Sequence, residues 1–228
     1  MKRLQIPILL LTVVFAVFSS HAQTAFQNLG FESANVPVIP AGQFGGFVPI
    51  ADALPGWSGF AGTTQIAQVL ENNATLGAAG ISIFGPDFDM GAIISGRYTA
   101  LLQAGLGPSG SPVDTSIAQT GLVPATARFI EFKAQGNNFS VSFEGHGIPY
   151  SALGAGPNYI LYAADVSAFA GQAGELRFTS ESTPDRPSNG VWLDSITFSP
   201  IPEPDTICLA TLGAALLGVG LWRQRRQR

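Results

Sequence analysis

The sequence predicts an all-β domain, built as an antiparallel β-sandwich, and three observations support this prediction. Short stretches that alternate apolar and polar residues recur along the chain, for example Phe-Ser-Val-Ser-Phe at residues 139–143. Gly, Pro, Asn or Ser bounds each stretch, which indicates turns between strands. No long window places apolar residues at helical spacing between charged faces. Many short strands separated by turns are typical of a sandwich.

The expected strands follow one another from the middle of the chain to its last third. In order they are residues 80–84, 98–103, 129–133, 139–143, 159–162, 175–179 and 191–198. Residues 165–169 are the one expected helical turn, because the Asp165 carboxylate can accept hydrogen bonds from the N–H groups that open such a turn. Two further helices are expected outside the sandwich, one at each end of the chain.

The N-terminal segment has the pattern of a secretory signal peptide. Lys2 and Arg3 precede an apolar run at residues 6–18, and small residues then lead to Ala22. We therefore expect residues 1–22 to form a signal peptide that is cleaved after Ala22. An uncleaved N-terminal anchor is the alternative. Either interpretation implies export.

The C-terminal segment, residues 201–228, combines a short motif, an apolar helix and a basic end. Residues 207–222 are apolar or small, and at ~1.5 Å per residue they make a helix of roughly 24 Å, somewhat short of the ~30 Å hydrocarbon core. Such a helix spans a membrane if its flanking residues reach the interface. By the positive-inside rule the basic end stays cytoplasmic, so residues before the helix face outward. The basic end contains Arg223, Arg225, Arg226 and Arg228.

The motif before this helix is Pro202-Glu203-Pro204. Motif, helix and arginine cluster, in this order, resemble the PEP-CTERM sorting signal of exported bacterial proteins. The resemblance implies that an exosortase, a membrane cysteine transpeptidase, reads the motif and removes the tail, so that this chain is a substrate. The protein would be held in the cell-envelope membrane before processing and would then reach the cell surface or extracellular matrix. The alternative is an ordinary single-span anchor whose motif nothing reads.

Residues 23–200 remain as one acidic domain. They contain thirteen acidic residues, which are the chain's fifteen less Glu203 and Asp205, and five basic ones. This balance argues against nucleic acid and anionic lipid headgroups as partners. The chain's one cysteine, Cys208, lies in the C-terminal helix, so the exported domain has no disulfide. Its stability must come from an apolar core or from a metal ion.

Short motifs at the two ends of this domain carry a second resemblance. Residues 28–32 read Asn-Leu-Gly-Phe-Glu, residues 55–57 read Pro-Gly-Trp, and residues 193–198 read Leu-Asp-Ser-Ile-Thr-Phe. This set resembles the galactose-binding-like jelly rolls, a fold that many carbohydrate-binding modules share. The resemblance implies that the first and last strands lie side by side, with a structural calcium ion near them. Glu32 and Asp194 are the implied carboxylate ligands, and two solvated carboxylates at strand ends are the alternative.

Four residues are candidates for contact with an extracellular polysaccharide. Trp57 and Trp192 could stack on sugar rings, although either ring could equally belong to the core of a sandwich. Asp185 and Arg186 lie in a proline-bounded loop and are of the kind that bind hydroxyl groups, but such turns are often merely exposed.

The sequence assigns no catalytic residue. His146 is the one histidine outside the signal peptide, and no Gly-x-Ser-x-Gly motif accompanies it. We therefore expect a non-enzymatic surface or matrix protein whose sandwich associates with exopolysaccharide. A scaffold without a defined sugar ligand is one alternative, and a glycan-active hydrolase that uses paired carboxylates is another.

Overall fold

The computed structural model describes residues 24–40, 42–86, 88 and 93–200 of the 228-residue chain. The expected signal peptide, the Pro-Glu-Pro motif, the apolar C-terminal helix and the arginine tail therefore lie outside the described residues. Within the described part of the chain, no helix is long and apolar enough to cross a membrane.

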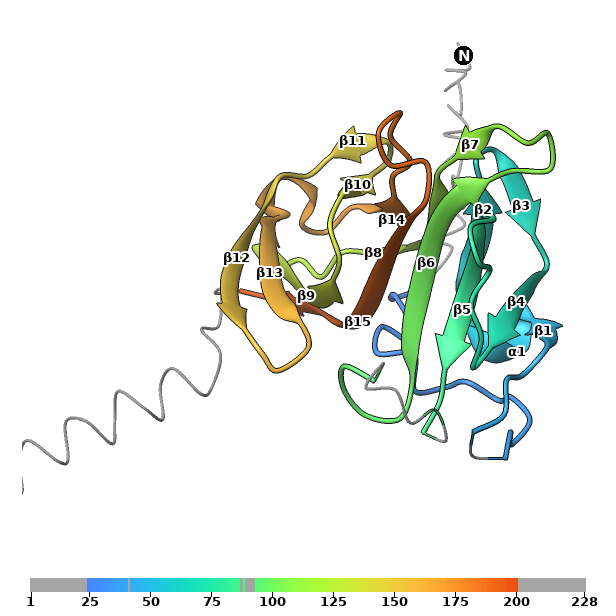
Figure 1. Ribbon diagram of the computed structural model, residues 1–228. Coiled ribbons are helices and arrows are strands. Elements are labelled where there is room, and N and C mark those ends of the chain that lie inside the picture. The colour runs from blue at the N-terminus through green and yellow to red at the C-terminus, as the bar shows by residue number, and fades with distance from the viewer. Residues whose placement is uncertain (1–23, 41, 87, 89–92, 201–228) are drawn as a thin grey trace, which may run out of the picture.

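Two β-sheets pack face to face (Figure 1). The larger sheet contains, in spatial order, β1 (Phe47–Pro49), β4 (Gln68–Glu71), β5 (Gly80–Phe84), β6 (Thr99–Leu106), β15 (Asn189–Ser199), β9 (Phe129–Gln135), β13 (Ile160–Asp165) and β12 (Tyr150–Ala155), and β7 (Pro112–Val113) pairs with β6. The smaller sheet contains β11 (His146–Gly147), β10 (Phe139–Phe143), β14 (Ala173–Ser180), β8 (Thr115–Leu122), β2 (Ser58–Ala61) and β3 (Thr64–Ile66). Two short helices, α1 (Ile50–Ala53) and the 3-10 helix η1 (Ser167–Phe169), complete the described elements.

The prediction of a mostly antiparallel two-sheet sandwich is confirmed. Each of the seven expected strands overlaps a strand of the structure, and the helical turn expected at residues 165–169 is η1. The Ser167 N–H donates to Asp165 Oδ1 at 2.8 Å, although the N-cap position of η1 is Val166 and not Asp165. One pair differs from the expectation, because β4 and β5 run parallel.

Alternation along the strands explains why the sandwich has one apolar core. In β10, Phe139, Val141 and Phe143 are buried, whereas the two serines between them are partly exposed. Phe132 of β9 meets Phe178 of β14 edge to face at 5.2 Å, which joins the two sheets across the core. Burial of apolar area contributes about 25 cal/mol per Å², so these rings are a main source of stability.

The last strand, β15, lies between β6 and β9 in the middle of the larger sheet. A bulge interrupts its pairing with β9 between Asp194 and Thr197, and Ser195 there has a φ of 49°. The Ile196 N–H donates to Leu29 O, and the Phe26 ring stacks on Phe198 at 5.4 Å. The first described segment therefore lies beside the last strand, but it forms turns where the resemblance implied a strand, and the first strand, β1, pairs with β4 at the edge of the sheet.

Candidate functional site

Asp194 is buried at the bulge in β15 and is 1% exposed. Its Oδ2 accepts hydrogen bonds from the Ser95 N–H at 3.1 Å and from the Thr99 hydroxyl at 2.7 Å. Its Oδ1 accepts from the N–H and the hydroxyl of Ser195. Burial raises the pKa of Asp194 to about 6, and these hydrogen bonds oppose that rise only in part. The donors belong to Ser95 in the segment before β6, to Thr99 at the start of β6 and to Ser195 in the bulge itself.

Glu32 reaches the same peptide segment from the opposite end of the chain. Its Oε1 accepts from the Arg97 N–H at 2.9 Å and from the Tyr98 N–H at 3.2 Å, and its Oε2 accepts from the Arg97 N–H at 3.1 Å. The structure thus brings both predicted calcium ligands to residues 95–99. What joins them there is a set of hydrogen-bond donors.

This donor set does not fit calcium, which needs six to eight oxygen ligands. Both carboxylates face N–H and O–H groups, whose hydrogens would repel a cation. Among residues 24–200 as far as they are described, no group of three or more His, Cys, Asp or Glu side chains could hold a metal ion. A calcium ion shared by Glu32 and Asp194 therefore stays a prediction that this geometry argues against.

The two predicted stacking residues have different surroundings. Trp57 is 4% exposed in the main core, where its Nε1 donates to Asn28 O at 3.1 Å, so its ring is not available to a sugar. The interpretation of Trp57 as a ligand contact is thus corrected in favour of the core. Trp192 is half-buried on the outer face of the larger sheet and lies 4.5 Å from the Phe84 ring. Its outer side stays a candidate contact surface.

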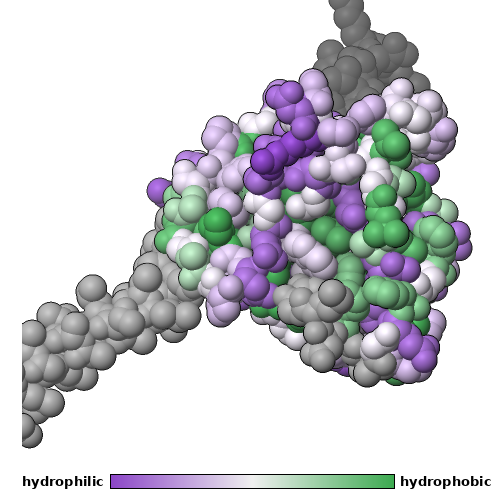
Figure 2. All heavy atoms as spheres, viewed as in Figure 1, coloured by the Kyte–Doolittle hydropathy of each residue, from purple (hydrophilic) through white to green (hydrophobic). Residues whose placement is uncertain are grey.

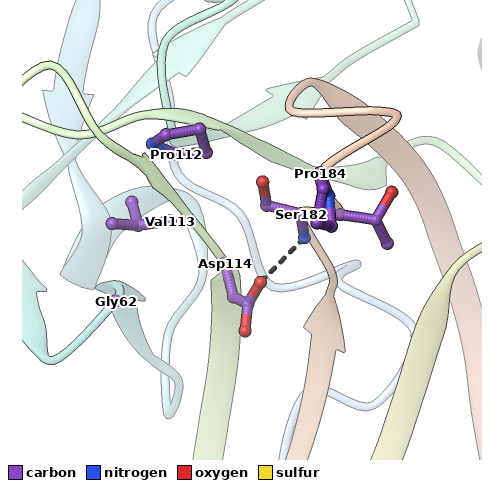
Figure 3. Close-up of a pocket in the computed structure, with 7 residues that line it drawn as sticks. Gly62, Pro112, Val113, Asp114, Ser182 and Pro184 are labelled. Carbon is purple, nitrogen blue, oxygen red and sulfur yellow. Dashed lines mark hydrogen bonds between the residues drawn. The ribbon is translucent and has the colours of Figure 1, made fainter.

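A cleft of about 440 Å³ lies beside the loop that joins β14 to β15 (Figure 3). Figure 1 places this loop and β7 at the same end of the sandwich. The lining residues are Gly62, Pro112, Val113, Asp114, Ser182, Thr183 and Pro184. Asp114 Oδ1 accepts from the Ser182 N–H at 2.7 Å, which ties the start of the loop to the residue between β7 and β8. No sequence pattern indicated this site, since Asp114 is an isolated acid 68 residues from its partner.

The loop itself is a tight turn held by its own backbone. Thr183 and Arg186 exchange two N–H···O hydrogen bonds, both at 3.0 Å. Arg186 Nη1 also donates to Asn137 Oδ1 at 3.4 Å. Both Asp185 and Arg186 are exposed, and neither lines the cleft, although their neighbours do. The two predicted hydroxyl-binding residues thus lie at the rim of a site whose walls the sequence did not reveal.

A second, smaller hollow of about 190 Å³ lies on the other side of this loop. Gly77, Gln103, Ala104, Ser188, Asn189 and Gly190 line it. In Figure 2 the upper part of this face is mostly hydrophilic, and hydrophobic residues gather at the right, where Figure 1 places β4 to β7. Residues of the loop between β14 and β15 line part of each hollow.

Comparison with known proteins identifies the C-terminal segment. Residues 200–226 match the family model of the PEP-CTERM protein-sorting motif, which confirms the identification made from the sequence. The motif implies an exported, cell-surface protein that an exosortase processes. No curated protein matches the chain.

Two solved structures resemble the sandwich. One is TmCBM61 in complex with beta-1,4-galactotriose, with a TM-score of 0.39 and 10% identity over 78% of this chain and 99% of that chain. The other is an apo-form cyclase from Fischerella sp., with a TM-score of 0.42 and 17% identity over 79% of this chain and 98% of that chain.

Proposed function

We propose that this protein is an exported exosortase substrate whose β-sandwich, with jelly-roll topology, is displayed at the cell surface and associates with matrix polysaccharide. The observation that carries the proposal is the sorting motif at residues 200–226, which begins directly after β15. A domain followed at once by a sorting signal is delivered as the cargo of that signal. The domain therefore acts where the signal leaves it, outside the cytoplasmic membrane.

The cleft beside Asp114 supports the polysaccharide part of the proposal. Pro112, Val113 and Pro184 supply apolar wall surface, which suits the C–H face of a pyranose ring. The exposed Asp114 carboxylate uses one oxygen for the Ser182 N–H, and its other oxygen can accept sugar hydroxyls. A hydrogen bond to a charged group contributes about 1.5 to 3 kcal/mol.

The charge of the domain narrows the ligand class. With thirteen acidic and five basic residues in 23–200, the surface repels polyanions. A neutral polysaccharide is thus the proposed ligand. We assign no catalytic residue, and His146 lies exposed in the short strand β11, apart from the cleft lining.

Mass spectrometry of the mature protein tests the sorting step. In a strain with a working exosortase, the protein should have lost the tail that contains Arg223 and Arg228. Replacing Pro202-Glu203-Pro204 by three alanines should retain the tail. An intact C-terminus in the unmodified protein would reduce the segment to a simple anchor.

Affinity electrophoresis in gels that contain neutral polysaccharides tests the ligand. We expect the domain to be retarded in at least one such gel and Asp114→Asn to lose most of the retardation. Asp52→Asn is the matched control, since it removes the same charge from α1, whose exposed Asp52 does not line the cleft. If the domain migrates as fast in every gel with a neutral or acidic polysaccharide as in a gel without one, the result would favour a scaffold that binds no defined sugar.

A further inference from the structure

The peptide segment before β6 turns three backbone N–H groups toward carboxylates from two distant parts of the chain. The N–H of Ser95 donates to Asp194, and the N–H groups of Arg97 and Tyr98 donate to Glu32. Gly96 between them has a φ of 61°, in the left-handed region. Nearby N–H groups around a left-handed residue form a concave anion-binding nest.

Gly96 is the residue that this arrangement requires. A Cβ at position 96 would overlap the Glu32 carboxylate, so any other side chain there would push Glu32 away. Its positive φ is also unfavourable for every residue with a Cβ. The approach of Glu32 and the bend of the nest thus depend on the same glycine.

We propose that residues 94–99 are an intramolecular anion nest that closes the two ends of this domain without a metal ion. The nest holds Glu32 from the first described segment and Asp194 from β15 at the same time. The nest takes the place that a shared calcium ion would have, because the N–H groups, like a calcium ion, supply positive charge between the two carboxylates. In the nest this charge comes from peptide dipoles.

A side-chain cation strengthens this assignment. Lys133 of β9 is the cross-strand partner of Asp194, and its Nζ donates to Ser95 Oγ at 3.4 Å. Lys133 thus brings a full positive charge to the segment that binds both carboxylates. A divalent cation placed there would meet this ammonium group as well as the N–H donors, and both would oppose its binding.

Thermal unfolding of the full-length chain in mild detergent separates the nest from a metal clasp. We expect EDTA and millimolar calcium to change the Tm by less than about 1 °C. Asp194→Ala should lower the Tm by about 4 to 8 °C, since it leaves buried donors without an acceptor. Glu32→Ala should lower the Tm by less, because Glu32 is exposed and water can accept from the freed Arg97 N–H. The Tm of the double variant should fall by less than the sum of the two single decreases, because both carboxylates hold the same segment.

Hydrogen exchange gives a readout that does not depend on overall stability. Peptides that cover residues 94–99 should exchange at least tenfold faster in Glu32→Ala than in the unmodified protein. The control is Glu144→Ala, which removes a carboxylate that accepts from the Glu175 N–H elsewhere and should leave residues 94–99 protected. The conservative Glu32→Gln, which keeps one acceptor oxygen, should restore most of the protection.

Two results would overturn the nest. One is a Tm that falls by several degrees in EDTA and recovers with calcium in the unmodified protein but not in Glu32→Ala, which would establish a metal clasp. The other is unchanged exchange of residues 94–99 in both carboxylate variants.

Discussion

The nest at residues 94–99 and the cleft at Asp114 use the same chemical group in opposite ways. In the nest, Asp194 is 1% exposed and accepts from four donors of its own chain. In the cleft, Asp114 is exposed and its hydrogen bond in the structure comes from the Ser182 N–H. A carboxylate whose acceptor capacity is filled internally stabilises the fold, whereas one with capacity left over can bind a ligand. The number of hydrogen bonds that a carboxylate accepts within its own chain therefore distinguishes a structural acid from a candidate binding acid.

The largest effect should come from breaking the nest at Gly96. Gly96→Ala places a Cβ against the Glu32 carboxylate at a φ of 61°. Left-handed strain and the lost carboxylate–amide bonds together should lower the free energy of unfolding by roughly 3 to 4 kcal/mol. Urea denaturation measures this change.

Gly110→Ala is the control for strain alone. Gly110 has a φ of 77°, and nothing lies within 4 Å of a Cβ placed there. Its substitution should lower the free energy of unfolding by only about 1 to 2 kcal/mol. Equal losses at positions 96 and 110 would show that Glu32 adds nothing to the nest.

A somewhat smaller effect should appear as a pH dependence of stability. The pKa of Asp194 is about 6 in the folded protein, against 3.8 ordinarily. The stability that the protonated Asp194 carboxyl contributes is therefore fully present below about pH 3.8, and it is lost as the pH rises through 6. A tenfold change in an ionisation constant corresponds to about 1.4 kcal/mol, so the free energy of unfolding should fall by about 2 kcal/mol between pH 4 and pH 7.

Asp194→Ala isolates this contribution from those of other acids, including Glu71, whose pKa burial also raises. The penalty of the substitution, measured by urea denaturation at each pH, should be larger at pH 4 than at pH 7. If the unmodified protein and the variant show parallel pH profiles, the buried carboxyl does not titrate in this range.

The smallest effect on stability should come from the cleft. In Asp114→Asn the side-chain oxygen can still accept from the Ser182 N–H, so the free energy of unfolding should change by less than about 0.5 kcal/mol. Urea denaturation at pH 7 measures it. A loss above about 1.5 kcal/mol would place Asp114 with Asp194 as a structural acid and remove the contrast between the two sites.

Much of the sandwich could be predicted because burial of one face imposes alternation, as in Phe139–Phe143. The sequence missed β8, Thr115–Leu122, where residues on both faces are buried and alternation disappears. It also missed the short strands β1 and β4, which exist through pairing with neighbours rather than through a local pattern.

The candidate sites were less predictable, because they depend on backbone groups. The resemblance implied that Glu32 and Asp194 share a calcium ion, but what they share in the structure is a run of N–H groups that almost any sequence supplies. Gly96 was the one local sign of the nest, among 27 glycines in the chain. Asp114 and Ser182 meet only through the fold, and a single exposed acid carries no pattern.

The position of β15 determines how the domain responds to a mechanical load. The strand ends at Ser199, immediately before the sorting motif, so tension applied through the C-terminal end passes first into β15. β15 has hydrogen-bonded neighbours on both sides, β6 and β9, and these bonds run perpendicular to the pull. A pull along β15 therefore loads many of these hydrogen bonds together in shear. An edge strand, in contrast, could peel away by breaking one hydrogen bond after another. A domain attached to an envelope at this point would resist traction along a strand that is paired on both sides.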